Sequence, residues 1–135
     1  MQTILVPIDF TDCSLNAADY ACQLAKQTNG EIILLHAFHV PAPVSEAPIV
    51  VVTVEELEQQ YGAQLEALKT NLFNRYHLPI DVLCKPGFAT DIVSEVAQDI
   101  EADLIVISLM INKKYILNDK FFIFFIRNYF PKRNV

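Results

Sequence analysis

Short runs of apolar, mostly β-branched residues alternate along this chain with stretches of helical periodicity. The strand-like runs cover residues 3–8, 32–38, 80–84 and 104–107. Continuous apolar runs of this length are typical of strands that are buried on both faces of a sheet. Because parallel neighbours need a crossover connection, strands that alternate with helices indicate a parallel sheet covered by helices.

The three intervening stretches have the pattern of amphipathic helices. The apolar face of the first helix contains Leu15, Ala18, Cys22 and Ala25. The apolar face of the second helix contains Leu57, Tyr61, Leu65, Leu68, Leu72 and Tyr76. The apolar face of the third helix contains Ile92, Val93, Val96, Ala97 and Ile100. The candidate N-terminal caps are Thr11 or Asp12, then Thr53 in a capping box with Glu56, then Thr90 or Asp91. Asn29-Gly30 ends the first helix and His77-Leu78-Pro79 ends the second. The order βαβαβαβ predicts a three-layer α/β fold with a doubly wound parallel sheet.

Ligands of such sheets bind beyond the carboxyl ends of the strands, where the strand order reverses. In this chain the corresponding segments are Asp9–Thr11, Ala37–His39, the Pro86–Ala89 turn and the residues after Ile107. We therefore expect any small-molecule site to be built from these four segments.

A fifth strand is harder to place than the four clear ones. After Ile107 the only apolar run is Phe121–Ile126, and 12 residues separate it from Ser108. A parallel crossover needs about a dozen residues or more. The fifth strand of the sheet is therefore missing or replaced, and residues 121–126 can form an edge strand, a helix or an intermolecular strand.

The composition divides the chain into two unlike segments. Residues 1–111 contain 4 basic and 15 acidic residues, whereas residues 112–135 contain 6 basic and 1 acidic residue and 7 of the 14 aromatic residues. The first segment has 12 alanines and the second has none, while 18 of the last 24 residues are Lys, Asn, Ile, Phe or Tyr, the types favoured by codons rich in A and T. We predict an α/β domain over residues 1–111, followed by an atypical basic, aromatic tail over residues 112–135. A truncated gene or a frameshift is our hypothesis for this tail.

The net charge limits the kinds of partner that the protein can bind, and the cysteines indicate the cellular compartment. A net charge of −6 argues against nonspecific binding to nucleic acid or to an anionic membrane. The three cysteines, Cys13, Cys22 and Cys84, lack the paired spacing of a disulfide framework or a zinc site. The first residues do not resemble a secretory signal, and no run reaches the roughly 18 apolar residues of a membrane span. We expect a cytoplasmic protein with no nucleic-acid, membrane or metal site.

Four motifs in this order resemble those of the universal stress protein family, and together they cover roughly residues 1–108. They are Pro7-Ile8-Asp9-Phe10-Thr11, Leu34-Leu35-His36-Ala37, Gly87-Phe88-Ala89 before Ile92-Val93, and Ala102-Asp103-Leu104-Ile105-Val106-Ile107. The resemblance implies a flavodoxin-like sheet of five parallel strands, as in the adenine nucleotide alpha hydrolase-like folds. It also implies a stress-response protein that forms homodimers and binds ATP.

The same resemblance implies where a nucleotide would bind. Asp9 would contact the nucleotide and Ala37 its adenine, while Pro7, Ile107 and Ser108 would line the site. No residue is implied to be catalytic, so we expect a binding module and not an enzyme.

The chain departs from the family after its fourth strand. Nucleotide-binding members have a glycine-rich loop there, of the form Gly, two residues, Gly, about nine residues, Gly and Ser or Thr. Such a loop holds phosphates on backbone amides, and glycine permits the close approach. Residues 108–114 stand in its place, and no glycine follows Gly87. We therefore expect weakened ATP binding.

Alternatives remain for the site and for the function. Asp9 can instead cap the helix that follows it and accept hydrogen bonds from backbone amides. His36 and His39 are three residues apart on an extended segment, so their rings do not share a face, and His36 is interpreted as a core histidine. Ser14 lacks a neighbouring base and a nucleophile elbow. An interaction or dimerisation module that binds no nucleotide is the main alternative function, and a hydrolase or redox enzyme of the same sheet class is a weaker one.

Overall fold

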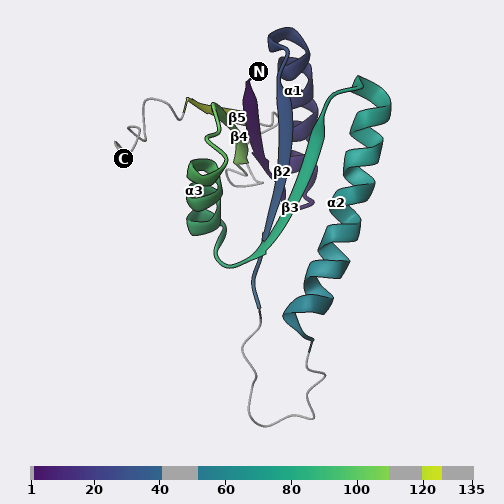
Figure 1. Cartoon of the computed structure of the whole chain (residues 1–135), viewed down its shortest axis with the longest axis vertical. Coiled ribbons are helices and arrows are strands. Elements are labelled where there is room, and N and C mark those ends of the chain that lie inside the picture. The colour runs from purple at the N-terminus through teal and green to yellow at the C-terminus, as the bar shows by residue number, and fades with distance from the viewer. Residues whose placement is uncertain (1, 41–51, 110–119, 126–135) are drawn as a thin grey trace.

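A computed structural model describes residues 2–40, 52–109 and 120–125 of the chain, with side chains as far as Ile107. The strands of this part are β1 (Thr3–Pro7), β2 (Glu31–Phe38), β3 (Ile80–Pro86), β4 (Leu104–Leu109) and β5 (Lys120–Phe125). Its helices are α1 (Asp12–Thr28), α2 (Val54–Tyr76) and α3 (Ala89–Asp99) (Figure 1). The three prolines Pro41, Pro43 and Pro48 predict a loop over residues 39–52, and residues 41–51 of it lie outside the described residues, as does most of the predicted tail.

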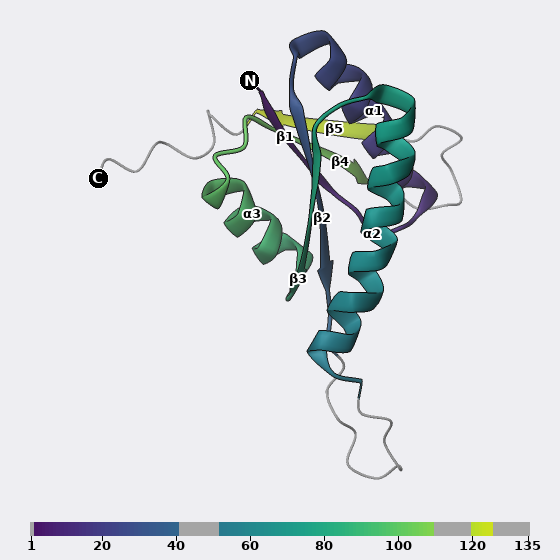
Figure 2. The same cartoon turned by 45° about the vertical axis from the view of Figure 1, so that its right-hand side comes forward.

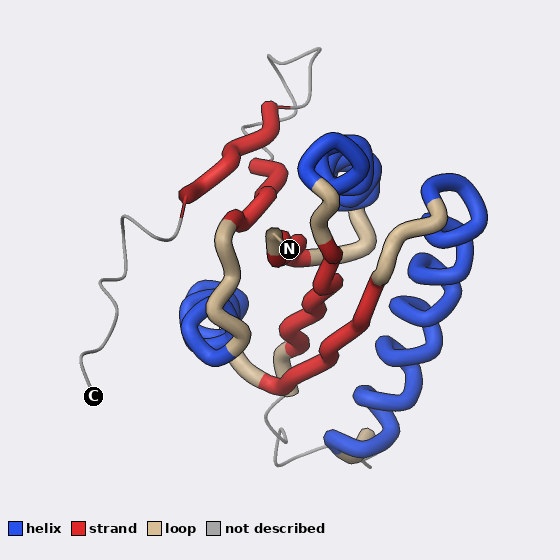
Figure 3. The backbone as a smooth tube through the Cα atoms, turned by 45° about the horizontal axis from the view of Figure 1, so that its top comes forward, coloured by secondary structure: helices blue, strands red, loops and turns tan. Residues whose placement is uncertain are grey.

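The strands form one sheet in the order β3-β2-β1-β4-β5. The first four are parallel, and Leu5 of β1 lies opposite Ile33 of β2 and Ile105 of β4. Helices α1 and α2 cover one face and α3 covers the other, which Figure 3 shows with the sheet between them. This arrangement confirms the predicted three-layer, doubly wound α/β fold.

The core is divided by the sheet into two apolar clusters. Ile4 and Val6 of β1 point to the α1/α2 side, whereas Leu5 between them points to the α3 side. All three side chains are completely buried. On the α1/α2 side, Ile4 and Val6 share one cluster with the completely buried residues Ala17, Ala18, Ala21, Leu65 and Leu72. The small alanine side chains let α1 lie close to the sheet.

The helix ends follow local chemistry. Thr11 caps α1 by accepting a hydrogen bond from the Ser14 N–H, and Thr53 forms the predicted capping box with α2. Asn29 and His77 end α1 and α2 in the left-handed conformation.

The prediction that Thr90 or Asp91 caps α3 is wrong. The helix begins at Ala89, and its N-cap Phe88 forms no side-chain cap hydrogen bond. The reason is the turn at Gly87, whose φ of 137° lets the chain leave β3 and enter the helix at once. Thr90 and Asp91 therefore fall inside the first turn, where a carboxylate still interacts favourably with the helix dipole.

β5 runs antiparallel to β4, with Leu104 opposite Phe125 and Leu109 opposite Lys120 (Figure 2). The fifth parallel strand that the family resemblance implied is therefore replaced by an antiparallel strand of the same chain, so residues 120–125 are neither helical nor paired only with another molecule. An antiparallel return needs no crossover, and the ten residues between β4 and β5 are enough to make it.

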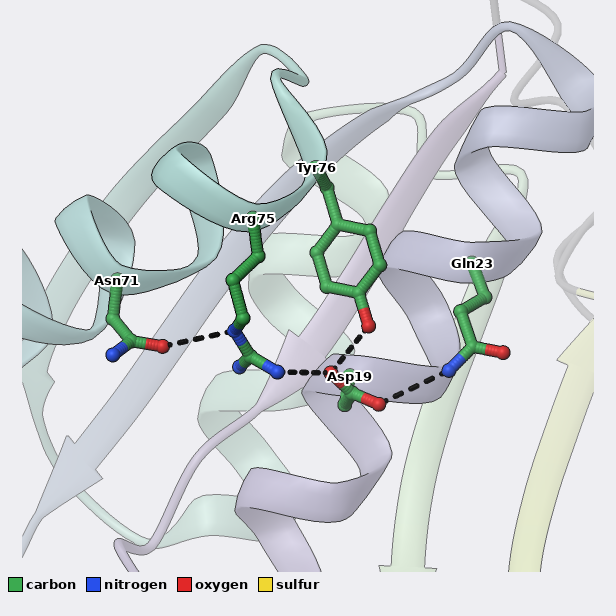
Figure 4. A network of polar contacts seen from close by, with 5 residues as sticks. All are labelled: Asp19, Gln23, Asn71, Arg75 and Tyr76. Carbon is green, nitrogen blue, oxygen red and sulfur yellow. Dashed lines mark hydrogen bonds and ion pairs between the residues drawn. The ribbon is translucent and has the colours of Figure 1, made fainter.

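Polar side chains join α1 to α2 at the surface (Figure 4). The Asp19 carboxylate accepts hydrogen bonds from Arg75 Nη1 at 2.8 Å, from the Tyr76 hydroxyl at 2.5 Å and from Gln23 Nε2 at 3.0 Å. The bond to Asp19 raises the pKa of the Tyr76 hydroxyl. Because the Arg75–Asp19 ion pair is partly exposed, it contributes little on its own, and its main effect is to fix how the two helices align.

Gly87 is the position where this fold most requires glycine. Besides its positive φ, an added Cβ would lie 2.9 Å from two side-chain carbons of Ile92. We predict that Gly87→Ala lowers the free energy of unfolding by about 1–3 kcal/mol, measured by urea denaturation. Gly62→Ala is the matched control, because Gly62 lies within α2 with nothing near an added Cβ. It should stabilise the protein by about 1 kcal/mol, and equal effects of the two substitutions would contradict the prediction.

Candidate functional site

The strand order reverses direction next to β1, because β2 lies on one side of it and β4 on the other. In folds of this type, ligands bind beyond the carboxyl ends of the strands at such a reversal. The predicted site residues lie at this end of the sheet.

Pro7, Ala37 and Ile107 lie at the carboxyl ends of β1, β2 and β4, three adjacent strands. Two residues before them in the same strands are Leu5, Leu35 and Ile105, which belong to the apolar cluster on the α3 side. Because alternate side chains of a strand share a face, Pro7, Ala37 and Ile107 also point to the α3 face. Each is partly exposed, and Ala37 and Ile107 pack against that cluster. The structure thus brings three of the five predicted residues together on one face. Ser108 follows in β4, and its side chain lies outside the described part.

Asp9 lies in the loop between β1 and α1, with its side chain exposed. Its Oδ1 accepts hydrogen bonds from the Thr11 N–H at 3.0 Å and from the Thr11 hydroxyl at 2.5 Å. The Asp9 N–H donates to Ser14 Oγ at 3.3 Å. The alternative that Asp9 caps α1 is wrong, because the cap is Thr11, but Asp9 does accept a hydrogen bond from a backbone amide just before the helix.

These contacts also set the charge of Asp9. Partial burial alone would raise the pKa of the carboxyl group, but hydrogen bonds, above all those donated by the Thr11 hydroxyl and N–H, lower the pKa by more, so it lies below its ordinary value of 3.8. Asp9 is a carboxylate at neutral pH. It can accept hydrogen bonds from hydroxyl groups or contact a cation at the mouth of the site.

Aromatic residues support this loop from the α1/α2 side. Phe10 has a φ of 62°, and its ring lies 4.9 Å from His36 and 6.2 Å from Tyr61, measured between centroids. His36 is buried, and its Nδ1 lies 2.6 Å from the carbonyl oxygen of Ile8. The prediction of a core histidine with a satisfied ring is confirmed. The left-handed Phe10 was missed, since nothing in the sequence of a strand end reveals the φ of a bulky residue.

A second aromatic pair borders the site at the end of β2. The Gly87 N–H donates to the Phe38 carbonyl oxygen at 3.0 Å, which places Phe88 beside this strand end. Phe88 is 67% exposed, and its ring lies 5.6 Å from that of His39. The sequence predicts that the turn at residues 86–89 contributes to the site, but it gives Phe88 no role, although an aromatic residue after Gly87 was the available clue.

The alternative chemistries find little support in the described part of the chain. Within it, no three His, Cys, Asp or Glu residues are grouped to hold a metal ion. Ser14 is buried, and its hydroxyl donates to the Thr11 carbonyl oxygen at 3.0 Å, which is a structural role. Burial raises the pKa of Cys22 to about 12 and that of Cys84 to about 11, so both are neutral thiols at pH 7. None of the helices described here is both long and apolar enough to cross a membrane.

The fold and this cluster define a doubly wound α/β domain with a candidate site at the carboxyl ends of β1, β2 and β4. A sequence model of the universal stress protein family matches residues 1–108. The chain therefore belongs to the universal stress protein family, and this region is a stress-response domain of that family. No curated protein matches the chain.

Solved structures with this fold include other members of the family. The universal stress protein UspA from Lactobacillus plantarum is 21% identical, with a TM-score of 0.66 and coverage of 84% of this chain and 81% of that one. A family member from Burkholderia pseudomallei is 18% identical, with a TM-score of 0.65 and coverage of 78% and 80%. A universal stress protein in complex with cAMP is 27% identical, with a TM-score of 0.57 and coverage of 77% and 69%. Another from Arabidopsis thaliana, with AMP bound, has 13% identity, a TM-score of 0.54 and coverage of 79% and 75%.

The Asp9 contacts predict a stability term that depends on pH. Because the pKa of Asp9 is lower in the folded protein than in the unfolded chain, its ionised form stabilises the fold above about pH 4. That contribution is lost as the pH falls through the folded pKa. We predict that Asp9→Ala lowers the free energy of unfolding by about 1 kcal/mol at pH 7, and that the difference from wild type shrinks below pH 4.

This prediction is measured by urea denaturation between pH 2.5 and pH 7. Glu66→Ala, an exposed substitution on α2, is the control and should show no comparable loss at pH 7. A deficit in Asp9→Ala that is the same at pH 3 and pH 7 would show that the carboxylate does not stabilise the loop.

Proposed function

We propose that this protein is a cytoplasmic stress-response module that binds an adenine nucleotide weakly at the carboxyl ends of β1, β2 and β4, and is not an enzyme. The observation that carries this proposal is the convergence of Pro7, Ala37 and Ile107 on one face, next to the ionised Asp9. Apolar side chains beside one carboxylate suit a nucleoside, whose base is flat and apolar and whose ribose offers hydroxyl donors. The family members with bound cAMP and AMP support an adenine ligand.

Each residue has a proposed role in this site. Ala37 contacts the adenine, since its small side chain leaves room for a ring against β2. Asp9 accepts from the ribose hydroxyls or holds a cation that bridges to phosphate. Pro7, Ile107 and Ser108 line the remainder. The exposed ring of Phe88 at the end of β2 gives the base an aromatic surface to stack on.

The chain offers fewer binding groups for the phosphates than for the rest of the nucleotide. No glycine follows Gly87, so residues 108–114 cannot form the glycine-rich loop of the nucleotide-binding members. Without it the binding energy comes mainly from the nucleoside. AMP, cAMP and ATP should then bind with similar affinities, because additional phosphates gain few backbone hydrogen bonds.

Isothermal titration of the full chain with ATP and magnesium, AMP and cAMP tests this function. We expect dissociation constants on the order of 0.1–1 mM, equivalent to about −4 to −5.5 kcal/mol. Ala37→Leu should abolish binding by filling the space for adenine, whereas Ala67→Leu on the exposed side of α2 should leave it unchanged. Submicromolar binding of ATP would contradict the weakened phosphate site, and failure of all three nucleotides to bind would contradict the proposed function.

Self-association is a second candidate function, supported by the position of β5. This strand lies at the edge of the described sheet, with β4 as its neighbour. A strand at a sheet edge presents backbone N–H and C=O groups on its outer side, which can pair with a second molecule. We propose a homodimer formed in this way, which does not require nucleotide binding.

Light scattering measures this association directly. The dimer should have twice the 15.3 kDa mass of one chain, and the mass should fall on dilution. A mass of 15.3 kDa at every concentration up to about 0.5 mM would contradict the dimer, because weak but specific interfaces are populated there.

A further inference from the structure

We propose that Phe10, His36 and Tyr61 form an aromatic clamp that positions Asp9 for its ligand, so that Tyr61 and His36 are positioning residues of the site and not only core residues. The statement about a ligand rests on the proposed function, whereas the effect of the clamp on the Asp9 loop does not.

Phe10 is held in a conformation that its own side chain disfavours. A bulky residue with a φ of 62° is an outlier, since the left-handed region brings Cβ too close to the following carbonyl. Surrounding contacts must therefore hold Phe10 in place. Its ring provides them, 4.9 Å from the His36 ring and 6.2 Å from the Tyr61 ring, to which it is nearly parallel at 13°.

His36 fixes the other side of Asp9. Since a carbonyl oxygen can only accept a hydrogen bond, the 2.6 Å contact means that Nδ1 of His36 carries a proton and donates it to the Ile8 oxygen. The Ile8 N–H in turn donates to the Leu35 carbonyl oxygen at 2.7 Å. Asp9 thus lies between Ile8, which is bonded to β2 in both directions, and Phe10, which is held by its ring.

Tyr61 connects this arrangement to α2. Its ring lies 4.5 Å from that of His36 and 5.7 Å from that of Phe38. His36 projects to the α1/α2 face, because it follows Leu34 of that cluster by two residues, whereas Ala37 projects to the α3 face. The clamp therefore supports the loop from the face opposite the proposed ligand, so its members act on binding by positioning Asp9 and not by contact with the ligand.

The experiment follows the pKa of Asp9 by NMR in variants of the full chain. Phe10→Asn removes the ring but keeps a residue that tolerates positive φ, and Tyr61→Leu removes the aromatic face while keeping an apolar side chain. Both should raise the pKa of Asp9 toward 3.8, because the hydrogen bonds that Thr11 donates to its carboxylate depend on the loop geometry. Tyr61→Phe retains the ring and should leave the pKa as in wild type.

Leu72→Val is the matched control. Leu72 is completely buried on the same helix, three turns from Tyr61, so this variant loses core packing and should not shift the pKa of Asp9. If Phe10→Asn does not fold, Tyr61→Leu and its partner Tyr61→Phe still give the comparison. An unchanged pKa in Tyr61→Leu, or an equal shift in Leu72→Val, would overturn the clamp.

Nucleotide titration of the same variants separates the two proposals. If wild type binds AMP, Tyr61→Leu should raise the dissociation constant about tenfold while Tyr61→Phe leaves it unchanged. A raised Asp9 pKa with no change in affinity would overturn the part of the inference that concerns the ligand. If wild type binds no nucleotide, the proposed function fails, and the Asp9 titration still decides whether the clamp positions the loop.

Discussion

The burial of β1 on both faces is the constraint on which the rest of the structure depends. Ile4, Leu5 and Val6 are three successive residues, and none exposes any surface. Because neighbouring side chains of a strand point to opposite faces, three such residues demand apolar cover on both sides. Burial of each contributes about 2 kcal/mol. The α1/α2 layer covers Ile4 and Val6, and α3 covers the face of Leu5, so one short strand requires a three-layer fold.

This constraint also determines where a ligand can bind. A strand enclosed on both faces can reach solvent only at its ends, and β1 leaves the core through Pro7 and Ile8 into the loop of Asp9. At this point the chain changes from a fully buried strand to an exposed carboxylate within a few residues. The same end of the sheet carries the partly exposed Ala37 and Ile107 on the α3 face, and the aromatic rings of Phe10, His36 and Tyr61 on the opposite face. The proposed ligand site and its support are thus separated by the thickness of one sheet.

Most of the fold could be predicted from the sequence because its determinants are local. The apolar runs, the capping box at Thr53 and the left-handed end at Asn29 each depend on residues within a few positions, and the structure confirms them. The same holds for the placement of Pro7, Ala37 and Ile107 at strand ends, although their binding roles stay predictions. The cap of α3 was predicted wrongly because the backbone conformation of Gly87 decides where that helix starts. A glycine in a turn can adopt several backbone conformations, and the sequence does not indicate which one it takes.

What could not be predicted depends on contacts between distant residues. The antiparallel direction of β5 follows from how the chain returns after β4, which composition does not reveal. The left-handed Phe10 is stabilised by Tyr61, 51 positions away in the sequence. A reader of the sequence sees a tyrosine at a core position of α2 and a phenylalanine in a loop motif, and nothing relates the two until the helix is placed on the sheet.

Electrostatics influence which kind of nucleotide suits the proposed site. The first 111 residues carry 15 acidic and 4 basic side chains, and Asp9 adds a carboxylate at the mouth of the proposed site. A polyphosphate brought to such a surface is repelled unless backbone amides or a cation offset its charge. Glycine-rich loops supply those amides in nucleotide-binding members of the family, and this chain has no glycine after Gly87 to supply them. Under the proposed function, magnesium offsets the charge of ATP but its additional phosphates add little affinity over a nucleotide with one phosphate, linear or cyclic, since the contacts are with the nucleoside that Ala37 and Asp9 would hold.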